Sequence, residues 1–296
     1  MIEIEDRIKA RYKDLTRNQQ RIIDLMLSSP QDAAFATARQ IGARTGLSES
    51  TVIRLAYALG YAGFPALLSA VREKFFSYLS TVERLQRTRE SDDSALSVYH
   101  RMLYMDIENI RSAIVTNSDA AFQRAERLIA KARSIYIIGQ RKSFALASYL
   151  HFCLSMMLNN SNLIDTAMGD LPEQLKKIGS EDLVVGICFR RYSTVTVEAF
   201  RWAKLRGAKT LAVTDSVKSP MVASGDVGLI CDTSRSISFT ESLVGPLAVI
   251  HALIVGVSLH HKEKAGKTLK SLEALYKQFG SLYTLRDGVE GSRPKD

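Results

Sequence analysis

Residues 38–59, with the sequence ARQIGARTGLSESTVIRLAYAL, decide how the first part of this 296-residue chain folds. They predict a short helix, a tight turn and a second helix, an arrangement that places one helix in a DNA groove. Gly46 stands where the turn requires a left-handed backbone, and Ser48 stands where it can cap the second helix. The apolar positions have the spacing that packs two short helices at a steep angle: Ile41, Leu47, Val52 and Leu55. The alternative is an ordinary pair of surface helices that packs or binds a partner.

Polar side chains on the outer face of the second helix are predicted to face DNA, since such groups contact base edges and phosphates. Arg54 is the best candidate for a contact with a guanine or a phosphate. Thr37 and Lys74 are candidates for further phosphate contacts. We expect Arg54→Ala to abolish operator binding while leaving the fold and ligand binding intact. The predicted DNA-facing residues of the helix are Ser48, Glu49, Ser50, Thr51 and Arg54.

The composition is typical of a soluble globular protein of about two domains, with 46% hydrophobic and 24% charged residues. The net charge of +9 favours a polyanionic partner. Basic side chains outnumber acidic ones between residues 39 and 89, within the segment that resembles a DNA reader. Cys153, Cys188 and Cys231 lie in apolar runs without metal-ligand spacing, which is typical of buried thiols in a reducing compartment. We therefore expect neither a metal nor a cofactor.

Two segments bear on location. The N-terminus, MIEIEDRIKARY, is acidic and amphipathic and does not have the order of a signal peptide. Residues 243–259, LVGPLAVIHALIVGVSL, are apolar but short for a membrane span, and they include Pro246 and His251. This run predicts a buried core helix or a dimer-interface helix. We expect a cytoplasmic protein that does not engage a membrane.

The pattern changes at Ser134 from helices to apolar strands that alternate with helices. Such continuous apolar strands are typical of a parallel sheet covered on both faces. The predicted fold is an all-α helix-turn-helix domain followed by an α/β three-layer sandwich with a flavodoxin-like parallel sheet of about five strands. The predicted strands are residues 135–138, 162–164, 183–187, 210–213 and 227–230. The predicted helices between them are 143–158, 170–178, 194–206 and 239–260, with a turn at 219–223.

The polar and charged segment 81–93 predicts a domain boundary. The expected units are a helix-turn-helix DNA-binding domain, a linker with a long helix, an effector-binding α/β domain and a flexible tail. Their bounds are 1–80, 81–117, 118–280 and 281–296. The predicted helices outside the sheet region are 17–28, 37–45, 49–59, 65–80, 94–115, 118–132 and 271–280.

A ligand of an open parallel sheet binds beyond the carboxyl ends of the strands, where the strand order reverses. One loop that fits follows strand 135–138 and opens a helix, with two cations beside the helix N-terminus. A second follows strand 183–187 and carries hydroxyls and arginines, and strand 210–213 also ends in polar residues. The predicted effector-binding residues are Gly139, Gln140, Arg141, Lys142, Ser143, Arg190, Arg191, Tyr192, Ser193, Thr194, Thr196, Asp215 and Glu241.

Catalysis would require an acid–base pair within reach of these loops. The candidate groups are Glu198, Asp215, Glu241 and His251. Glu198 and Glu241 fall near helix starts, where a carboxylate is favoured in any case. His251 lies within an apolar run. These groups do not converge on one site in the sequence, and we assign no catalytic residue.

The two halves together resemble the RpiR/MurR transcriptional regulators, bacterial proteins with an N-terminal helix-turn-helix domain and a C-terminal sugar isomerase (SIS) domain. In the first half the resemblance is carried by ATARQIGARTGLSESTVIRLAYALGYAGFPAL. In the second half it is carried by IYIIGQRKSFALASYL and DLVVGICFRRYSTVTVEAFRWAKLRGAKTLAVTDSVKSPMVASGDVGLI. It implies a homodimer or homotetramer that binds double-stranded operator DNA and senses a sugar phosphate or related anionic metabolite. It also implies phosphate-binding hydroxyls at Ser143 and in the loop 188–196.

The chain departs from the usual SIS loops at two places. Many SIS domains have a Gly-x-Gly-x-Ser first loop, and Arg141 stands here in place of the second glycine. Many have a Ser-x-Ser-Gly-x-Thr second loop, where this chain has larger and cationic groups at residues 188–193. Arginine-rich loops suit a carboxylated or otherwise anionic metabolite. Two alternatives stay open: a SIS-type sugar phosphate isomerase with an accessory helical domain, and a second domain that serves oligomerisation without a ligand.

Overall fold

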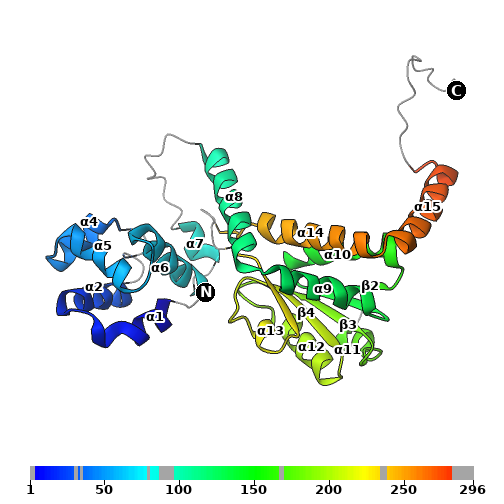
Figure 1. Cartoon of the computed structure of the whole chain (residues 1–296), viewed down its shortest axis with the longest axis horizontal. Helices are drawn as coiled ribbons and strands as arrows, with labels where there is room; N and C mark the ends of the chain where they lie inside the picture. The colour runs from blue at the N-terminus through cyan, green and yellow to red at the C-terminus, as the bar shows by residue number, and fades with distance from the viewer. Residues whose placement is uncertain are drawn as a thin grey trace, which may run out of the picture.

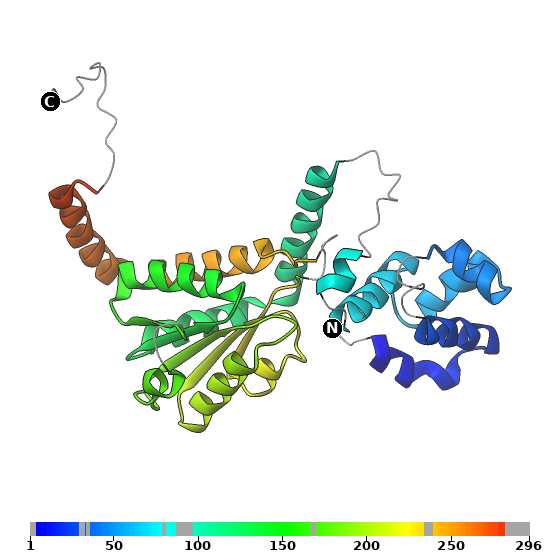
Figure 2. The ribbon, with the colours of Figure 1, turned by 180° about the vertical axis from the view of Figure 1, so that it is seen from behind.

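In the computed structural model, a helical N-terminal half lies beside an α/β C-terminal half, with a long helix between them (Figure 1). The view from behind shows the same arrangement, with the helices of the first half grouped at one end of the molecule (Figure 2). The structure describes residues 4–29, 33, 36–78, 81–86, 97–166, 170–233 and 239–281. The all-helical first half and the α/β second half confirm the predicted fold class.

Short capped helices build the first half. The elements are α1 (Ile4–Arg11), a 3-10 turn (Tyr12–Asp14), α2 (Arg17–Ser28), α4 (Ala38–Thr45), α5 (Glu49–Ala58) and α6 (Phe64–Tyr78). Thr16 and Thr37 begin α2 and α4 with reciprocal capping boxes, which satisfy backbone N–H groups at the helix starts. The side chains of Ile22, Ile41 and Leu55 are fully buried in one shared core.

The turn between α4 and α5 has the predicted geometry. Gly46 ends α4 with a φ of +68°, in the left-handed region. Ser48 then caps α5, its hydroxyl accepting from the backbone N–H of Thr51 at 3.3 Å. A Cβ at Gly42 would lie 2.6 Å from the backbone oxygen of Leu47, so this position must stay small for the two helices to pack.

The segment between the two halves is partly helical. The predicted boundary 81–93 begins with a short helix, α7 (Thr81–Gln86). The predicted long helix 94–115 is α8 (Val98–Thr116), which Ser97 caps; residues 94–96 lie outside the described residues. Ser118 caps α9 (Asp119–Lys131), as its sequence predicts. Helices thus begin or end at or near the borders of three of the four predicted units, those with the bounds 1–80, 81–117 and 118–280.

Five parallel strands form one sheet: β1 (Ile135–Gly139), β2 (Ser161–Ile164), β3 (Leu183–Ile187), β4 (Lys209–Thr214) and β5 (Val227–Ile230). Their order is β2-β1-β3-β4-β5, which is the order of a flavodoxin-like sheet, the type of sheet that the sequence predicts. Ile137 pairs with Leu163 on one side and with Val185 on the other. The order reverses between β1 and β3, which makes the carboxyl ends of these two strands the expected ligand position.

Helices cover both faces of the sheet (Figure 1). One face carries α9, α10 (Ser143–Leu158) and α14 (Val244–His260), and the other carries α11 (Leu171–Leu175), α12 (Thr194–Leu205) and α13 (Pro220–Ala223). Two helices are shorter than predicted. The predicted helix 170–178 ends at Leu175, and the predicted helix 239–260 begins at Val244. The segment before Val244 is thereby left to form part of a pocket wall.

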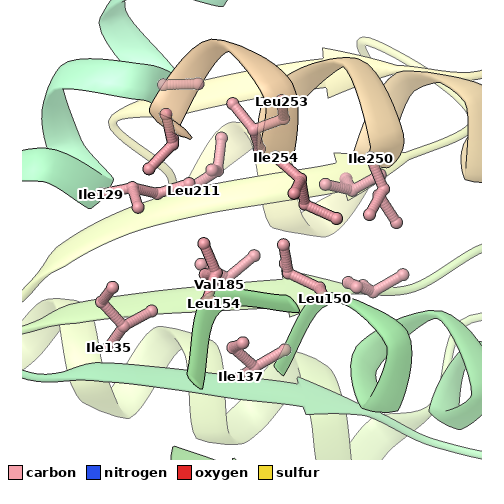
Figure 3. Close-up of a cluster of buried hydrophobic side chains, with 14 of the residues drawn as sticks. Ile129, Ile135, Ile137, Leu150, Leu154, Val185, Leu211, Ile250, Leu253 and Ile254 are labelled. Atoms are coloured by element: carbon pink, nitrogen blue, oxygen red, sulfur yellow. The ribbon is translucent and has the colours of Figure 1, made fainter. Parts of the chain in front are cut away.

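Aliphatic side chains from strands and helices interlock in the larger core (Figure 3). The labelled residues are Ile129, Ile135, Ile137, Leu150, Leu154, Val185, Leu211, Ile250, Leu253 and Ile254. Fully burying such a side chain is worth about 1.5–3 kcal/mol relative to leaving it exposed. These contacts hold the sheet as a rigid platform for the loops at its carboxyl edge.

The apolar run 243–259 forms most of α14, and Ile250, Leu253 and Val257 are buried in the core. It is therefore a core helix of the α/β half. Helix α15 (Lys262–Phe279) follows it and includes most of the predicted helix 271–280; residues 282–296 lie outside the described residues. Among the helices described, none is by itself long and apolar enough to cross a membrane. The pair α14 and α15 passes on length and composition and is bent by 102°.

Candidate functional site

The predicted DNA-facing side chains lie on the first turns of α5. Ser48, Glu49, Ser50 and Arg54 are exposed, and Thr51 is half-buried. The Ser48 hydroxyl lies 2.9 Å from the hydroxyls of Ser50 and Thr51. The Arg54 Nε donates to the backbone oxygen of Ser50 at 3.3 Å, which directs the guanidinium along the exposed side of the helix. This cluster offers hydroxyl groups and one cation from a rigid helix.

The two other predicted DNA contacts lie on different elements. Thr37 is exposed, and its hydroxyl accepts from the Gln40 N–H at 3.2 Å at the start of α4. A helix start is a favourable position for a phosphate. The side chain of Lys74 on α6 lies outside the described residues. Tyr57, which the sequence analysis did not select, is 58% exposed one turn beyond Arg54. Its signal is an aromatic side chain three positions after an exposed arginine.

A cavity of about 290 Å³ opens at the carboxyl ends of β1 and β3, where the strand order reverses. Its size is just below the roughly 300–1,000 Å³ of small-molecule sites, which suits a single small ligand. We call this cavity the switch-point pocket. The residues that line it are Thr81, Gln140, Arg141, Lys142, Ser143, Cys188, Phe189, Arg190, Arg191, Ser193, Phe239, Thr240 and Glu241.

The loop between β1 and α10 forms one wall of the pocket. Gly139 ends β1 directly beneath Ser143, where a Cβ would lie 2.7 Å from the Ser143 backbone oxygen. Arg141 has a φ of +58°, in the left-handed region, and Ser143 is buried. The Lys142 ammonium forms an ion pair with Glu241, which approaches from the segment before α14. Two distant parts of the chain thus meet across the pocket.

The start of α10 differs from the expected anion site in one respect. The backbone N–H groups of Ser143, Phe144 and Ala145 donate to the carbonyl oxygens of Gln140, Arg141 and Lys142 at 3.0–3.3 Å. This turn satisfies donors that a helix N-terminus usually offers to an anion. The charged side chains of the loop, rather than these N–H groups, therefore supply its attraction for a negatively charged ligand.

The loop between β3 and α12 forms the facing wall. The Arg190 Nε lies 3.0 Å from a carboxylate oxygen of Asp215, and the Arg191 guanidinium donates to the Thr81 hydroxyl at 3.1 Å. Cys188 is buried, and its Sγ accepts from the Ser193 N–H at 3.2 Å. Burial raises the pKa of the Cys188 thiol, so it stays neutral near pH 7. This wall presents cations and one neutral thiol.

Asp215 holds the second loop from behind. The Tyr192 hydroxyl donates to Asp215 Oδ1 at 2.8 Å, on the carboxylate that also binds Arg190. Burial, and then the charge of Asp215, raises the pKa of Tyr192 far above its ordinary value of about 10. The phenol therefore remains a hydrogen-bond donor at every physiological pH. This anchor fixes the position of the arginine-bearing loop.

The structure separates the predicted effector-binding residues into two groups. Gln140, Arg141, Lys142, Ser143, Arg190, Arg191, Ser193 and Glu241 line the switch-point pocket. Gly139, Tyr192, Thr194, Thr196 and Asp215 do not line it. Thr194 is exposed on α12, and Thr196 is fully buried. Gly139, Tyr192 and Asp215 act from beneath the loops, as supports of the residues that line the pocket.

Several lining residues were absent from the sequence prediction: Thr81, Cys188, Phe189, Phe239 and Thr240. Cys188 and Phe189 lie within the predicted loop 188–196 but were not selected as individual ligand-binding residues. Phe239 and Thr240 belong to a segment predicted as helix. Thr81 lies 110 positions before Arg191, its hydrogen-bond partner, and nothing local marks it.

The candidate acid–base groups do not assemble in the pocket. Glu198 is exposed and pairs with Arg201 at 2.9 Å. His251 lies on α14, where its Nδ1 is 2.8 Å from the Tyr149 hydroxyl. Of the four candidates, Glu241 is the one that lines the pocket, and it is paired with Lys142. Within the described part of the chain, no group of three or more His, Cys, Asp or Glu residues could hold a metal ion.

Two family models match the two halves of the chain. Residues 2–77 match the helix-turn-helix domain of the rpiR family, and residues 128–256 match the SIS domain. Among curated proteins, the chain is 24% identical over 265 residues to the HTH-type transcriptional regulator HexR of Pseudomonas aeruginosa. The alignment covers 88% of this chain and 90% of HexR.

Solved structures show the same architecture. The sugar isomerase domain of an RpiR transcription factor from Sphaerobacter thermophilus is 27% identical, with a TM-score of 0.54, over 58% of this chain and 96% of that domain. The Vibrio vulnificus NanR protein, solved in complex with ManNAc-6P, has a TM-score of 0.57 and 16% identity. That match covers 94% of this chain and 99% of NanR, so the likeness of fold includes both halves.

Proposed function

This chain joins an RpiR-family helix-turn-helix domain to a SIS domain, and we propose from this premise that it is a ligand-responsive transcriptional regulator. The helix-turn-helix domain binds double-stranded operator DNA, and the SIS domain senses a sugar phosphate or related anionic sugar metabolite. The observation that carries the proposal is the basic pocket at the sheet's switch point, in a chain whose other half is a capped helix-turn-helix.

The DNA-binding part of the proposal rests on α5. Its first turns present three hydroxyl groups and Arg54 from a helix whose start is fixed by Ser48 and the turn at Gly46. Rigid presentation favours base contacts, because the side chains lose little further freedom on binding. A dimer would read two half-sites about one helical turn apart, or a multiple of that spacing.

The effector part of the proposal rests on the charge of the switch-point pocket. Four basic side chains line it, against one carboxylate: Arg141, Lys142, Arg190, Arg191 and Glu241. Hydroxyls of Ser143 and Ser193 lie on the same lining and can donate to an anion. The NanR structure contains a sugar phosphate, which supports the same ligand class for this chain. A neutral ligand would leave the net positive charge of this lining uncompensated.

Two contacts can carry the effect of the ligand to the DNA-binding half. Arg191 of the pocket donates to Thr81 of α7, and Lys218 beyond β4 pairs with Asp6 of α1. A ligand that draws Arg191 away from Thr81 binds one arrangement of the halves better than another. It thereby shifts the population between DNA-competent and incompetent arrangements. We propose a homodimer or homotetramer with the unit bounds 1–80, 81–117, 118–280 and 281–296.

A mobility-shift experiment tests the proposal. The full chain is mixed with DNA from upstream of its own gene and neighbouring genes, with and without a panel of phosphorylated and acidic sugars. A specific shift that one compound changes would support both parts of the proposal. A shift that no compound changes would refute the effector part. The absence of any specific shift, together with turnover of a sugar phosphate, would replace the proposal with the isomerase alternative.

A further inference from the structure

Tyr57 is an exposed aromatic side chain on the proposed DNA-reading helix α5. It is 58% exposed, and between residues 36 and 71, all of which the structure describes, it is the one large apolar side chain on the surface. The apolar side chains on the opposite face of α5 behave differently, since Leu55 and the following Leu59 are fully buried in the core. The ring of Tyr57 therefore contributes little to the packing of the helical half.

The phenol of Tyr57 also differs from two other tyrosines of the same half, which have partners. The Tyr12 hydroxyl donates to Asp24 at 2.8 Å, and the Arg7 guanidinium lies 4.6 Å from the centre of the Tyr61 ring. Among the residues that the structure describes, the Tyr57 hydroxyl makes no hydrogen bond and its ring makes no aromatic or cation–π contact. The side chain is thus available to a partner outside the chain.

The helix places Tyr57 in line with two of the predicted DNA contacts. Ser50, Arg54 and Tyr57 are all exposed and stand four and three residues apart, so they lie above one another on one face of α5. A rise of about 1.5 Å per residue makes this stripe about 10 Å long, or roughly three base steps of about 3.4 Å. The Arg54 Nε donates to the Ser50 backbone oxygen, which draws the guanidinium toward the start of α5 and away from Tyr57.

The position of the Tyr57 hydroxyl limits the directions that the ring can take. A Cβ at Gly63 would lie 3.7 Å from this hydroxyl, so the end of the ring stands beside the turn between α5 and α6. An aromatic ring held in this way loses little freedom when it meets a partner. The stripe therefore presents three different groups in a row: a hydroxyl, a cation and a positioned apolar ring.

The chemistry of the ring indicates which part of DNA it suits. In the major groove an arginine pairs with the acceptors of guanine, and an apolar side chain contacts the 5-methyl group of thymine. A neutral phenol neither attracts a phosphate by charge nor releases a counterion. A protein partner is a poorer match, because a stable protein interface buries about 800 Å² on each side and one isolated ring offers far less.

We propose that Tyr57 is a specificity-determining residue of α5, and that its ring contacts the 5-methyl group of a thymine close to the base pair that Arg54 contacts. This inference rests on the proposed function, because it assigns a role within the same DNA-reading helix. Each half-site of the operator then requires a thymine at one fixed position. Tyr57 contributes to the choice of sequence, whereas the general attraction for DNA comes from the basic side chains.

Replacement of thymine by deoxyuridine tests the inference, because it removes the 5-methyl group and keeps the base pair. Each thymine of the operator found by mobility shift is replaced in turn, and the Kd of the full chain is measured. We expect one thymine in each half-site whose replacement weakens binding about fourfold, the factor that burial of one such carbon provides. Tyr57→Ala should weaken operator binding by about fourfold or more and abolish the effect of deoxyuridine at that thymine. Tyr57→Phe keeps the ring and should retain both the affinity and the effect.

Two controls separate a base contact from other causes. Leu27→Ala removes another exposed apolar side chain of the helical half, 53% exposed on α2, and should leave operator affinity and the deoxyuridine pattern unchanged. Unrelated DNA of the same length measures binding that does not depend on sequence, and Tyr57→Ala should bind it as the unmodified chain does. Circular dichroism of each variant verifies the fold.

The outcomes distinguish this inference from the proposed function. Operator binding without any thymine that is sensitive to deoxyuridine would overturn the inference and leave the DNA-binding regulator standing. The same sensitivity in Tyr57→Ala would overturn the assignment to Tyr57. An equal loss of affinity for operator and unrelated DNA in Tyr57→Ala would place the side chain on the phosphate backbone and also overturn it. Absence of specific DNA binding by the unmodified chain would overturn the proposed function together with the inference.

Discussion

Asp6 on α1 of the helical half forms an ion pair with Lys218, which lies in the loop after β4 of the α/β half. The next residue, Arg7, donates to the carbonyl oxygen of Leu59 at 3.2 Å and of Gly60 at 2.7 Å. These carbonyls lie just beyond the end of α5. The ion pair therefore joins the α/β half to the residues that support the proposed DNA-reading helix.

The switch-point pocket lies close to the α/β end of the Asp6–Lys218 ion pair. Asp215, which holds Arg190 at 3.0 Å, stands three positions before Lys218 in the same loop. A ligand that competes with Asp215 for Arg190 acts on the loop whose Lys218 pairs with Asp6 of α1. We therefore expect Lys218→Glu to reduce the effector's change in operator affinity about two- to fivefold, since a half-exposed pair is worth at most about 1 kcal/mol. The measurement is the operator Kd with and without effector.

Restoring opposite charges provides the control for this prediction. The double variant Asp6→Lys with Lys218→Asp should regain much of the effector response, because an attractive pair is again possible. Full response in the single Lys218→Glu variant would show that the two halves communicate through other contacts.

Arg54→Ala should lower specific operator affinity at least tenfold, toward the affinity for unrelated DNA. One good contact of an arginine with a guanine is worth about 1–3 kcal/mol of discrimination. Arg127→Ala removes a positive charge that is also exposed, on α9, and should change operator affinity little. Mobility shift and circular dichroism of both variants separate loss of contact from loss of fold. An operator affinity equal to that of the unmodified chain would exclude α5 as the reader.

Gly42→Ala should destabilise the helical half more than Gly46→Ala. A methyl group at residue 42 would lie 2.6 Å from the Leu47 backbone oxygen, and the backbone cannot yield easily. At residue 46 nothing lies within 4 Å, so the penalty is the left-handed φ alone, about 1–2 kcal/mol. Urea unfolding of the two variants measures the order. The reverse order would mean that the packing of α4 against α5 is looser than described.

Asn117 ties the end of α8 to the edge strand β5, and its removal should be costly. Its side-chain amide donates to the Ile230 carbonyl at 2.7 Å, and its side-chain oxygen accepts from the Ile230 N–H at 2.7 Å. Asn117→Ala should lower the free energy of unfolding by about 1–3 kcal/mol, because the Ile230 backbone loses its partners. Asn162→Ala, whose amide makes one exposed bond of 3.3 Å, should have little effect. Thermal unfolding distinguishes the two.

Asp182 should make the α/β half sensitive to acid. Burial by itself raises the pKa of this carboxyl, but hydrogen bonds from Arg133 and the Gly179 N–H outweigh burial and hold the pKa below its ordinary value. A depressed folded-state pKa contributes stability above the unfolded value of about 3.9, and this stability is lost as the pH falls further.

Asp182→Asn should therefore be less stable than the unmodified chain at pH 7, and the difference should narrow below about pH 4. Urea unfolding at a series of pH values measures both chains. A difference that does not depend on pH would mean that the amide's packing, and not the charge, accounts for the effect.

The strands were predictable because a sheet buried on both faces requires continuous apolar runs, and each predicted run lies within one of β1–β5. The turn at Gly46 was predictable because left-handed geometry and N-capping restrict residue choice locally. The ends of helices were less predictable where no such local restriction on residue choice exists. The residues before Val244 carry no local sequence signal that marks the start of a helix. They lie at the pocket because Glu241 forms an ion pair with Lys142 there.

The pocket was only partly predictable. The loops after β1 and β3 follow from the rule for parallel sheets, and they supply most of its lining. Which loop residues line the pocket and which support them from behind depends on tertiary contacts. Tyr192 and Asp215 support Arg190 from behind, and this could not be derived without the position of β4 beside β3. The DNA contacts, including that of Lys74, the effector contacts and the bounds of the units remain predictions.

Thr81 belongs to α7, yet it forms part of the pocket wall and receives a hydrogen bond from Arg191. A truncated protein that starts at α8 would retain the sheet, both arginine loops and Glu241, and it would lose this piece of wall. Ligand screening on such a fragment would therefore test a pocket that lacks part of its lining. The lining of the switch-point pocket therefore extends beyond the α/β half into α7.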